Sequence, residues 1–218
     1  MTTPQDIPAP YVLAYSGEAV TPRLIFTPDP LSGELRLSYH KPRPRSDWHR
    51  GVLLARTRTN RRGQVMWRML NRHRQQECMA KGLCQVCAGP AADPATGRIW
   101  WVITETGWRG TNDSGGLTNA PPTCRACIPA SLRWCPQLRK SAAVYTVGGY
   151  ESAGVLADLY EPGPGGMPVF TGDHNRFVGW EEFALLPYAL ATQMVVHLND
   201  MALIEHGADP RETLLLTS

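Results

Sequence analysis

Short runs of mainly apolar residues recur along the first quarter of the chain. Residues 11–15, 23–27 and 34–39 form three such runs, separated by turns rich in Gly, Pro, Asp and Ser, and a fourth run covers residues 51–56. The run over residues 34–39 alternates polar and apolar residues, a period of two that is typical of strands with one buried face and one solvated face. We therefore predict strands of an antiparallel meander in this region.

Further along, several segments change to a helical period. We predict a helix over residues 64–81, ended by Gly82, and short helices over 130–138 and 151–159. The clearest helical pattern runs from Pro187 to Gly207, with a stripe of Leu186, Leu190, Met194, His197, Met201 and Ile204. Residues 97–104 and 144–147 are bulky and β-branched, which favours strands, and residues 111–116 have the composition of a flexible turn or loop.

These elements predict an α+β fold in four parts. Residues 1–10, with three prolines, form a flexible tail, and residues 11–63 form the antiparallel β region. Residues 64–140 hold a helix and a metal-binding module, and residues 141–218 form an α/β C-terminal part whose helices pack back on the sheet. The breaker Glu161-Pro162-Gly163-Pro164-Gly165-Gly166 is a candidate boundary inside this last part.

Composition describes an ordinary globular chain of 218 residues, 43% hydrophobic and 19% charged. No apolar run reaches the roughly 20 residues that cross a bilayer, and the N-terminus lacks the features of a signal peptide. We therefore expect a cytoplasmic protein that does not contact membranes. In a reducing compartment its six cysteines are expected to be metal ligands and buried thiols.

Four of these cysteines occur as two Cys-x-x-Cys pairs, Cys84 with Cys87 and Cys124 with Cys127. Two such turns supply four soft thiolates, which suit a tetrahedral zinc ion with no open position. The sequence therefore predicts a structural Zn site, with free or redox-active cysteine pairs as the alternative. Cys78 and Cys135 are left over as expected buried thiols, either of which could replace a ligand.

The cysteine pairs, a β segment between them and the run from Asn119 to Cys127 together resemble the treble-clef frame of zinc-bearing HNH nucleases, over residues 78–140 only. The resemblance implies that the four cysteines hold a structural zinc and that Asn119 matches the family's asparagine. The family's catalytic histidine is absent, because no histidine occurs between His73 and His174. The frame thus lacks a general base for hydrolysis. The whole chain also resembles proteins of GC-rich actinobacteria, which implies no activity.

Charge is unevenly distributed, although the net charge is only +3. Residues 41–76 contain eleven Lys or Arg and one acid, whereas residues 141–218 contain ten acids and two arginines. Clustered arginines attract phosphates, so candidate nucleic-acid contacts are Arg56, Arg58, Arg61, Arg62, Arg68, Arg72 and Arg74. On a helix, Arg61, Arg68 and Arg72 would share one face. The alternative is pairing of the basic stretch with the acidic one or with a partner protein.

From these patterns we expect a non-catalytic, zinc-stabilised protein that binds DNA or RNA or has a regulatory role. A zinc-stabilised adaptor that binds protein, or itself as an oligomer, is the alternative, and a metal-dependent HNH-like nuclease comes third. Two histidines have no assigned function. His174 lies in a polar run typical of a turn, and His197 lies on an apolar stripe.

Overall fold

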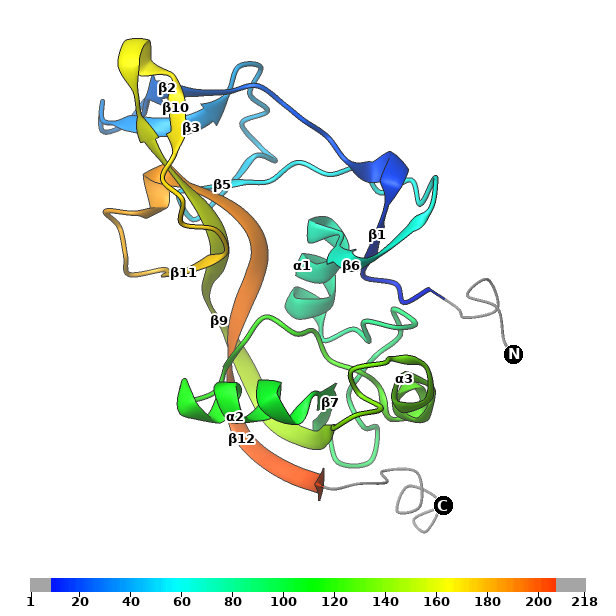
Figure 1. Ribbon diagram of the computed structural model, residues 1–218. Helices are drawn as coiled ribbons and strands as arrows, with labels where there is room; N and C mark the ends of the chain where they lie inside the picture. Colours follow the sequence, from blue (N-terminus) through cyan, green and yellow to red (C-terminus); the bar gives the residue numbers. More distant parts are fainter. Residues whose placement is uncertain (1–8, 207–218) are drawn as a thin grey trace.

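A long antiparallel pair of strands, β9 (Ala143–Pro162) and β12 (Ala189–His206), forms the centre of the computed structural model, which describes residues 9–206. Figure 1 shows the two strands as one bent ribbon that extends along most of the molecule. Every other strand of the main sheet pairs with this ribbon or with a strand beside it. The pair therefore sets the frame on which the remaining elements lie.

The main sheet has eight strands and is mixed. Along β9, three strands add in antiparallel pairing: β7 at its start, β11 at its middle and β10 at its end. Along β12, β5 adds in parallel and β8 in antiparallel pairing, and β4 continues from β5. The bounds of these six strands are β4 Trp48–His49, β5 Val52–Leu54, β7 Ile99–Ile103, β8 Leu117–Thr118, β10 Pro168–Phe170 and β11 Arg176–Gly179.

Two smaller antiparallel sheets lie outside the main one. Strand β2 (Leu24–Pro28) pairs with β3 (Leu35–Tyr39) in regular register. Strand β1 (Leu13–Tyr15) pairs with β6 (Val65–Leu70), with an irregularity after Leu13 that leaves residues 67–69 without partners in the register. The predicted strands over residues 11–15, 23–27, 34–39 and 51–56 are therefore present, but they belong to three different sheets.

Within the described residues, three α-helices accompany the sheets: α1 (Arg72–Lys81), α2 (Glu105–Asp113) and α3 (Ile128–Trp134). Helix α1 begins at the cap Asn71, whose side chain accepts the amide N–H of Arg74, and ends at Gly82 in the left-handed conformation. Short 3₁₀ turns occupy Ser16–Glu18, Arg125–Cys127, Pro164–Gly166 and Leu186–Tyr188. Within residues 9–206, no helix is long and apolar enough to cross a bilayer.

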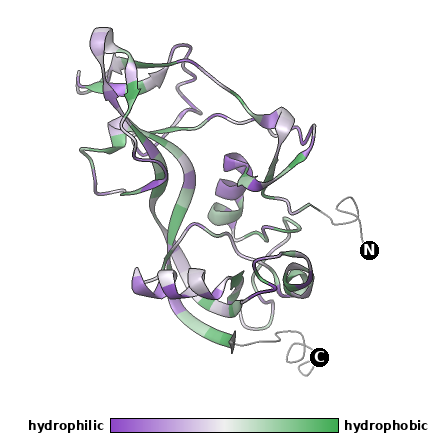
Figure 2. Ribbon diagram, viewed as in Figure 1, coloured by the Kyte–Doolittle hydropathy of each residue, from purple (hydrophilic) through white to green (hydrophobic). Residues whose placement is uncertain are grey.

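The largest apolar core lies on the main sheet and includes the buried side chains of Trp101, Tyr145, Val155, Val178 and Met194. A second cluster packs α3 against β7 and the start of β9, and a third packs the β2–β3 hairpin against β5. Figure 2 shows long hydrophobic stretches on β12, whereas α1 is hydrophilic over most of its length. Helix α1 contributes Met79 to the largest apolar core, and several of its polar side chains are also buried.

The predicted C-terminal helices are wrong. Residues 189–206 form strand β12, and residues 151–159, also expected to be helical, lie inside strand β9. Of the three register shifts between β12 and β9, those at Ala191/Gln193 and Leu203/Glu205 place an extra residue in β12, and the one at Val195/Val196 places it in β9. Each extra residue in β12 moves the next apolar residue by one position, so the apolar spacing departs from strict alternation and resembles a helical stripe. Gly207, the expected helix stop, lies outside the described residues.

The predicted helix over residues 64–81 and the predicted loop over residues 111–116 are also wrong in part. Residues 65–70 form strand β6, and only residues 72–81 are helical, so Arg61, Arg68 and Arg72 do not share a helix face. Residues 105–113 form helix α2, although residues 111–116 read as a loop. Gly107 and Gly110 lower the helical propensity of α2, while the hydroxyl of its cap Thr104 accepts the N–H of Gly107.

Candidate metal centre and the basic surface

The structure brings the four predicted cysteine ligands together. The sulfur atoms of Cys84, Cys87, Cys124 and Cys127 all lie within 4.8 Å of one another, and the Sγ atoms of Cys87 and Cys124 are 3.8 Å apart. A tetrahedral ion with metal–sulfur bonds of about 2.3 Å requires sulfur–sulfur separations of about 3.8 Å. The four thiols could therefore hold one metal ion.

The first cysteine pair lies in a tight turn directly after α1. The N–H of Cys84 donates to the carbonyl of Gly89 (2.7 Å), and the N–H of Ala88 donates to the carbonyl of Cys84 (2.8 Å). Ala88 has a φ of 62°, so the chain reverses there. The turn directs two amides at sulfur: Val86 N–H at Cys84 Sγ and Gly89 N–H at Cys87 Sγ, each at 3.4 Å. Such amides stabilise a thiolate.

The second cysteine pair lies at the start of α3. Cys124 precedes a 3₁₀ turn, Arg125–Cys127, which continues into the helix. The two pairs are also joined by hydrogen bonds, because Gln85 donates its backbone N–H to the carbonyl of Pro122 (2.8 Å) and its side-chain amide to Thr123 Oγ1 (2.9 Å). The backbone thus fixes the distance between the pairs independently of any ion.

The thiols of Cys87, Cys124 and Cys127 have shifted pKa values. Burial raises the pKa of Cys124 to about 11 and also raises the pKa of Cys127. Burial acts in the same direction on Cys87, but the amide of Gly89 and the neighbouring thiols outweigh it and lower the pKa of that thiol. Four thiolates this close would repel one another, and a bound divalent cation would remove that cost.

The two remaining cysteines lie outside this group. Cys78 is fully buried in α1, and burial raises its pKa to about 12, as expected of a structural thiol. Its sulfur contacts the carbonyl of Cys84 at 3.9 Å. Cys135, at the end of α3, is half-buried.

The N-terminal segment is attached to both the first cysteine turn and α1. Tyr11 N–H donates to the carbonyl of Val86 (3.0 Å), and Val12 N–H donates to the carbonyl of Gln85 (3.1 Å). The hydroxyl of Tyr11 donates to a carboxylate oxygen of Glu77 on α1 (2.7 Å). Burial and this hydrogen bond raise the pKa of Tyr11 to about 12. The cysteine turn therefore positions Tyr11.

Three of the seven candidate arginines are buried or half-buried and contact structural partners. Arg74 is 3% exposed and pairs with the buried Glu18 at 2.7 Å. Arg56 forms a two-point ion pair with Asp47 and stacks on Tyr39. Arg72 is half-buried and donates to Gln76. These side chains are occupied in holding the fold together.

The other four candidates, Arg58, Arg61, Arg62 and Arg68, are exposed. Three lie in the irregular segment between β5 and β6, and Arg68 lies on β6. Within residues 9–206, none of the four forms an ion pair, and no ion pair joins residues 41–76 to residues 141–206. In the part of the chain that the structure describes, the alternative of an internal match between the basic and acidic stretches is therefore not supported by any direct ion pair.

Asn119 and the two unassigned histidines lie apart from the cysteine group. The side chain of Asn119 donates to Gln193 on β12 (2.9 Å), which attaches the chain before the second cysteine pair to the main sheet. His174 contacts Asp158 at 2.5 Å, and His197 faces Glu151 at 3.9 Å.

Sequence reasoning did not find Tyr11, Glu18 or Glu77. The pairs Tyr11–Glu77 and Glu18–Arg74 join residues 66 and 56 positions apart, and no local motif marks such contacts.

No protein-family model matches the chain, and comparisons with curated proteins and with solved structures find no match.

Proposed function

We propose that the four cysteines hold one structural zinc ion. The sulfur separation of 3.8 Å between Cys87 and Cys124 agrees with the edge of a tetrahedral zinc–thiolate site. Four protein ligands leave no open position for a substrate, so the ion would act as a clamp between α1 and α3. Zinc is preferred because four thiolates in tetrahedral array suit this ion.

We further propose that the module has a treble-clef-like arrangement. The order of its elements supports this: a cysteine turn, strand β7, then a second cysteine pair that leads into a helix. Helix α2 lies between β7 and the second pair. The segment between the pairs contains no histidine, so this frame offers no imidazole base for phosphodiester hydrolysis. The proposed role is therefore binding without catalysis.

The proposed function is nucleic-acid binding through the exposed surface formed by Arg58, Arg61, Arg62 and Arg68, which we call the arginine surface. The observation that carries it is that these four guanidinium groups are exposed and form no ion pair within residues 9–206. Unpaired guanidinium groups attract phosphates and release counterions on binding. Trp67, 48% exposed on β6 beside Arg68, offers an aromatic face on which a base could stack.

A binding experiment with mixed-sequence single-stranded DNA and RNA tests this function. We expect fluorescence anisotropy to show binding at 50 mM salt that weakens steeply by 200 mM. Replacing Arg58, Arg62 and Arg68 with Gln should reduce the slope of log affinity against log salt by about 2, because each lost phosphate contact contributes about 0.7 for single strands. The triple variant Arg23→Gln, Arg45→Gln, Arg139→Gln removes the same charge from exposed positions elsewhere.

Equal effects of the two triple variants would show that only net charge matters and would contradict a defined surface. An absence of binding at 50 mM salt would contradict the function itself. The remaining candidate would then be a protein-interaction adaptor or a homo-oligomer. The exposed apolar side chains Met167, Val169 and Phe170 at the β9–β10 hairpin favour that second candidate.

A further inference from the structure

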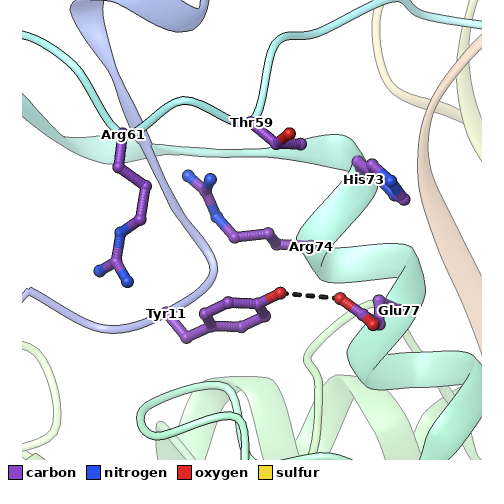
Figure 3. A pocket seen from close by; sticks show the side chains of 6 residues that line it. All are labelled: Tyr11, Thr59, Arg61, His73, Arg74 and Glu77. Carbon is purple, nitrogen blue, oxygen red and sulfur yellow. Dashed lines mark hydrogen bonds between the residues drawn. The ribbon is translucent and has the colours of Figure 1, made fainter.

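A cavity of about 280 Å³ lies where the N-terminal segment, the irregular segment before β6 and helix α1 meet. Figure 3 shows its walls: two arginine side chains on one side, a tyrosine ring below them, and a carboxylate and an imidazole from α1 on the other side. Its volume equals that of roughly nine water molecules. The lining residues are Tyr11, Thr59, Arg61, His73, Arg74 and Glu77.

Two guanidinium groups of the cavity lie near one aromatic ring. The guanidinium carbon of Arg74 is 5.8 Å from the centre of the Tyr11 ring, and that of Arg61 is 6.0 Å from it. The ring is held in place by the bond from its hydroxyl to Glu77. Two guanidinium groups and one aromatic ring therefore line the cavity.

The side chains that line the cavity carry a net positive charge. Glu18 neutralises Arg74 through two hydrogen bonds of 2.7 Å, and Lys81 neutralises Glu77 at 2.8 Å. Arg61 forms no ion pair within residues 9–206, and its side chain donates only to the hydroxyl of Tyr15 at 3.2 Å in that part of the chain. One uncompensated guanidinium charge therefore faces the cavity.

The backbone holds Arg61 in an unusual conformation. Its φ is 51°, in the left-handed region that a residue other than glycine rarely adopts. Its N–H donates to the buried carboxylate of Glu18 at 2.9 Å, and this bond maintains the conformation. Strain kept in place by a buried partner is a feature of ligand sites. Arg74 Nε is buried without a hydrogen-bond acceptor among the described residues, so the cavity wall also contains an unsatisfied donor.

We propose that this cavity binds a phosphomonoester, the terminal phosphate of a nucleic-acid strand. The inference rests on the proposed function, because the cavity shares Arg61 with the arginine surface. The Arg61 guanidinium and the Thr59 hydroxyl can donate to phosphate oxygens, and the Tyr11 ring can contact the attached sugar or base. A terminal phosphate fits this cavity better than an internal phosphate for two reasons. Side chains surround the cavity on several sides, so the end of a strand can enter it more easily than the middle of a strand. A phosphomonoester also carries more negative charge than a phosphodiester.

The test compares two oligonucleotides of one sequence, one with a 5′-phosphate and one with a 5′-hydroxyl, at 50 mM salt. We expect the full-length protein to bind the phosphorylated strand about tenfold more tightly, the effect of a strong charge-assisted hydrogen bond. Arg61→Gln should abolish this preference, and Thr59→Val should reduce it. Arg62→Gln, at the exposed neighbouring position outside the cavity, should weaken both complexes equally and keep the preference. Circular dichroism checks that each variant is folded.

Equal affinity of the wild type for both strands would overturn the inference and leave the proposed function intact. If neither strand binds, the proposed function fails, and AMP then tests the cavity alone. AMP binding that Arg61→Gln removes would support a phosphomonoester site for a free nucleotide. An absence of AMP binding in that case would overturn the site as well.

Discussion

At the scale of residues, the chain depends on a buried ion pair between Glu18 and Arg74. Glu18 is 1% exposed and its carboxylate accepts hydrogen bonds from Arg74, from Asn71 and from the N–H groups of Tyr15 and Arg61. Burial alone would raise the pKa of this carboxyl, but the hydrogen bonds outweigh it and lower the pKa to about 2. One carboxylate thus organises the segment before β6 and the start of α1.

This ion pair makes stability depend on pH in the acid range. The carboxyl has an ordinary pKa of 4.5 and a folded pKa of about 2, so its stabilising effect is complete above pH 4.5 and is lost as pH falls towards 2. We expect the free energy of unfolding, measured by urea denaturation, to fall over this range and to fall less steeply for Glu18→Gln. At pH 7 the variant should lose about 3–5 kcal/mol, because Arg74 is left buried and unpaired.

The exposed pair of Arg98 and Asp200 provides the control for this prediction. Asp200 is 72% exposed, so Asp200→Asn should cost less than about 1 kcal/mol. Identical acid slopes for the wild type and Glu18→Gln would show that Glu18 does not titrate with an altered pKa.

At the scale of elements, helix α1 is attached to the main sheet by one polar side chain. Gln75 is fully buried and donates to the carbonyls of Asn119 (2.9 Å) and Met194 (3.0 Å), while its side-chain oxygen accepts the N–H of Met194 (3.0 Å). Met194 lies on β12, and Asn119 lies shortly before the second cysteine pair. Gln75 therefore connects the helix, the sheet and the candidate metal centre.

Replacing Gln75 with Leu should destabilise the protein by at least about 2 kcal/mol, because buried backbone groups lose their partners. Thermal or urea unfolding measures this loss. Gln76→Leu is the matched control on the same helix, since Gln76 is only half-buried and bonds the side chain of Arg72. Similar losses in the two variants would indicate that Gln75 acts through helix propensity and not through its cross-element bonds.

At the scale of the whole molecule, the candidate zinc centre connects parts that lie far apart in the sequence. The first cysteine turn bonds to Tyr11 and Val12, and the second leads into α3, which packs on the start of β9. A metal ion would thus hold the N-terminal segment, α1 and α3 in one arrangement. The proposed phosphate cavity depends on that arrangement through Tyr11.

Metal analysis should find about one zinc per chain. Removal of the ion by a chelator, or by the double variant Cys84→Ser, Cys124→Ser, should lower the melting temperature and also weaken nucleic-acid binding. Structural zinc contributes its binding energy to folding. Cys135→Ser should keep the metal, because Cys135 lies outside the four-sulfur group. A metal-free wild type that is fully folded would contradict the proposed zinc site.

The sequence by itself determined the features that depend on near neighbours. It located the four clustered cysteines, because each pair lies within one tight turn, and it located the short strands in residues 11–56, because turns rich in Gly, Pro, Asp and Ser separate short apolar runs there. The tertiary structure decided the rest. Residues 151–159 and 189–206 are strands because β9 and β12 pair with each other over almost their full lengths, and bulges hide that pairing in the sequence. Tertiary contacts also determined which arginines remain exposed. Asp47 pairs with Arg56, and Glu18 pairs with Arg74. The exposed candidates are Arg58, Arg61, Arg62 and Arg68.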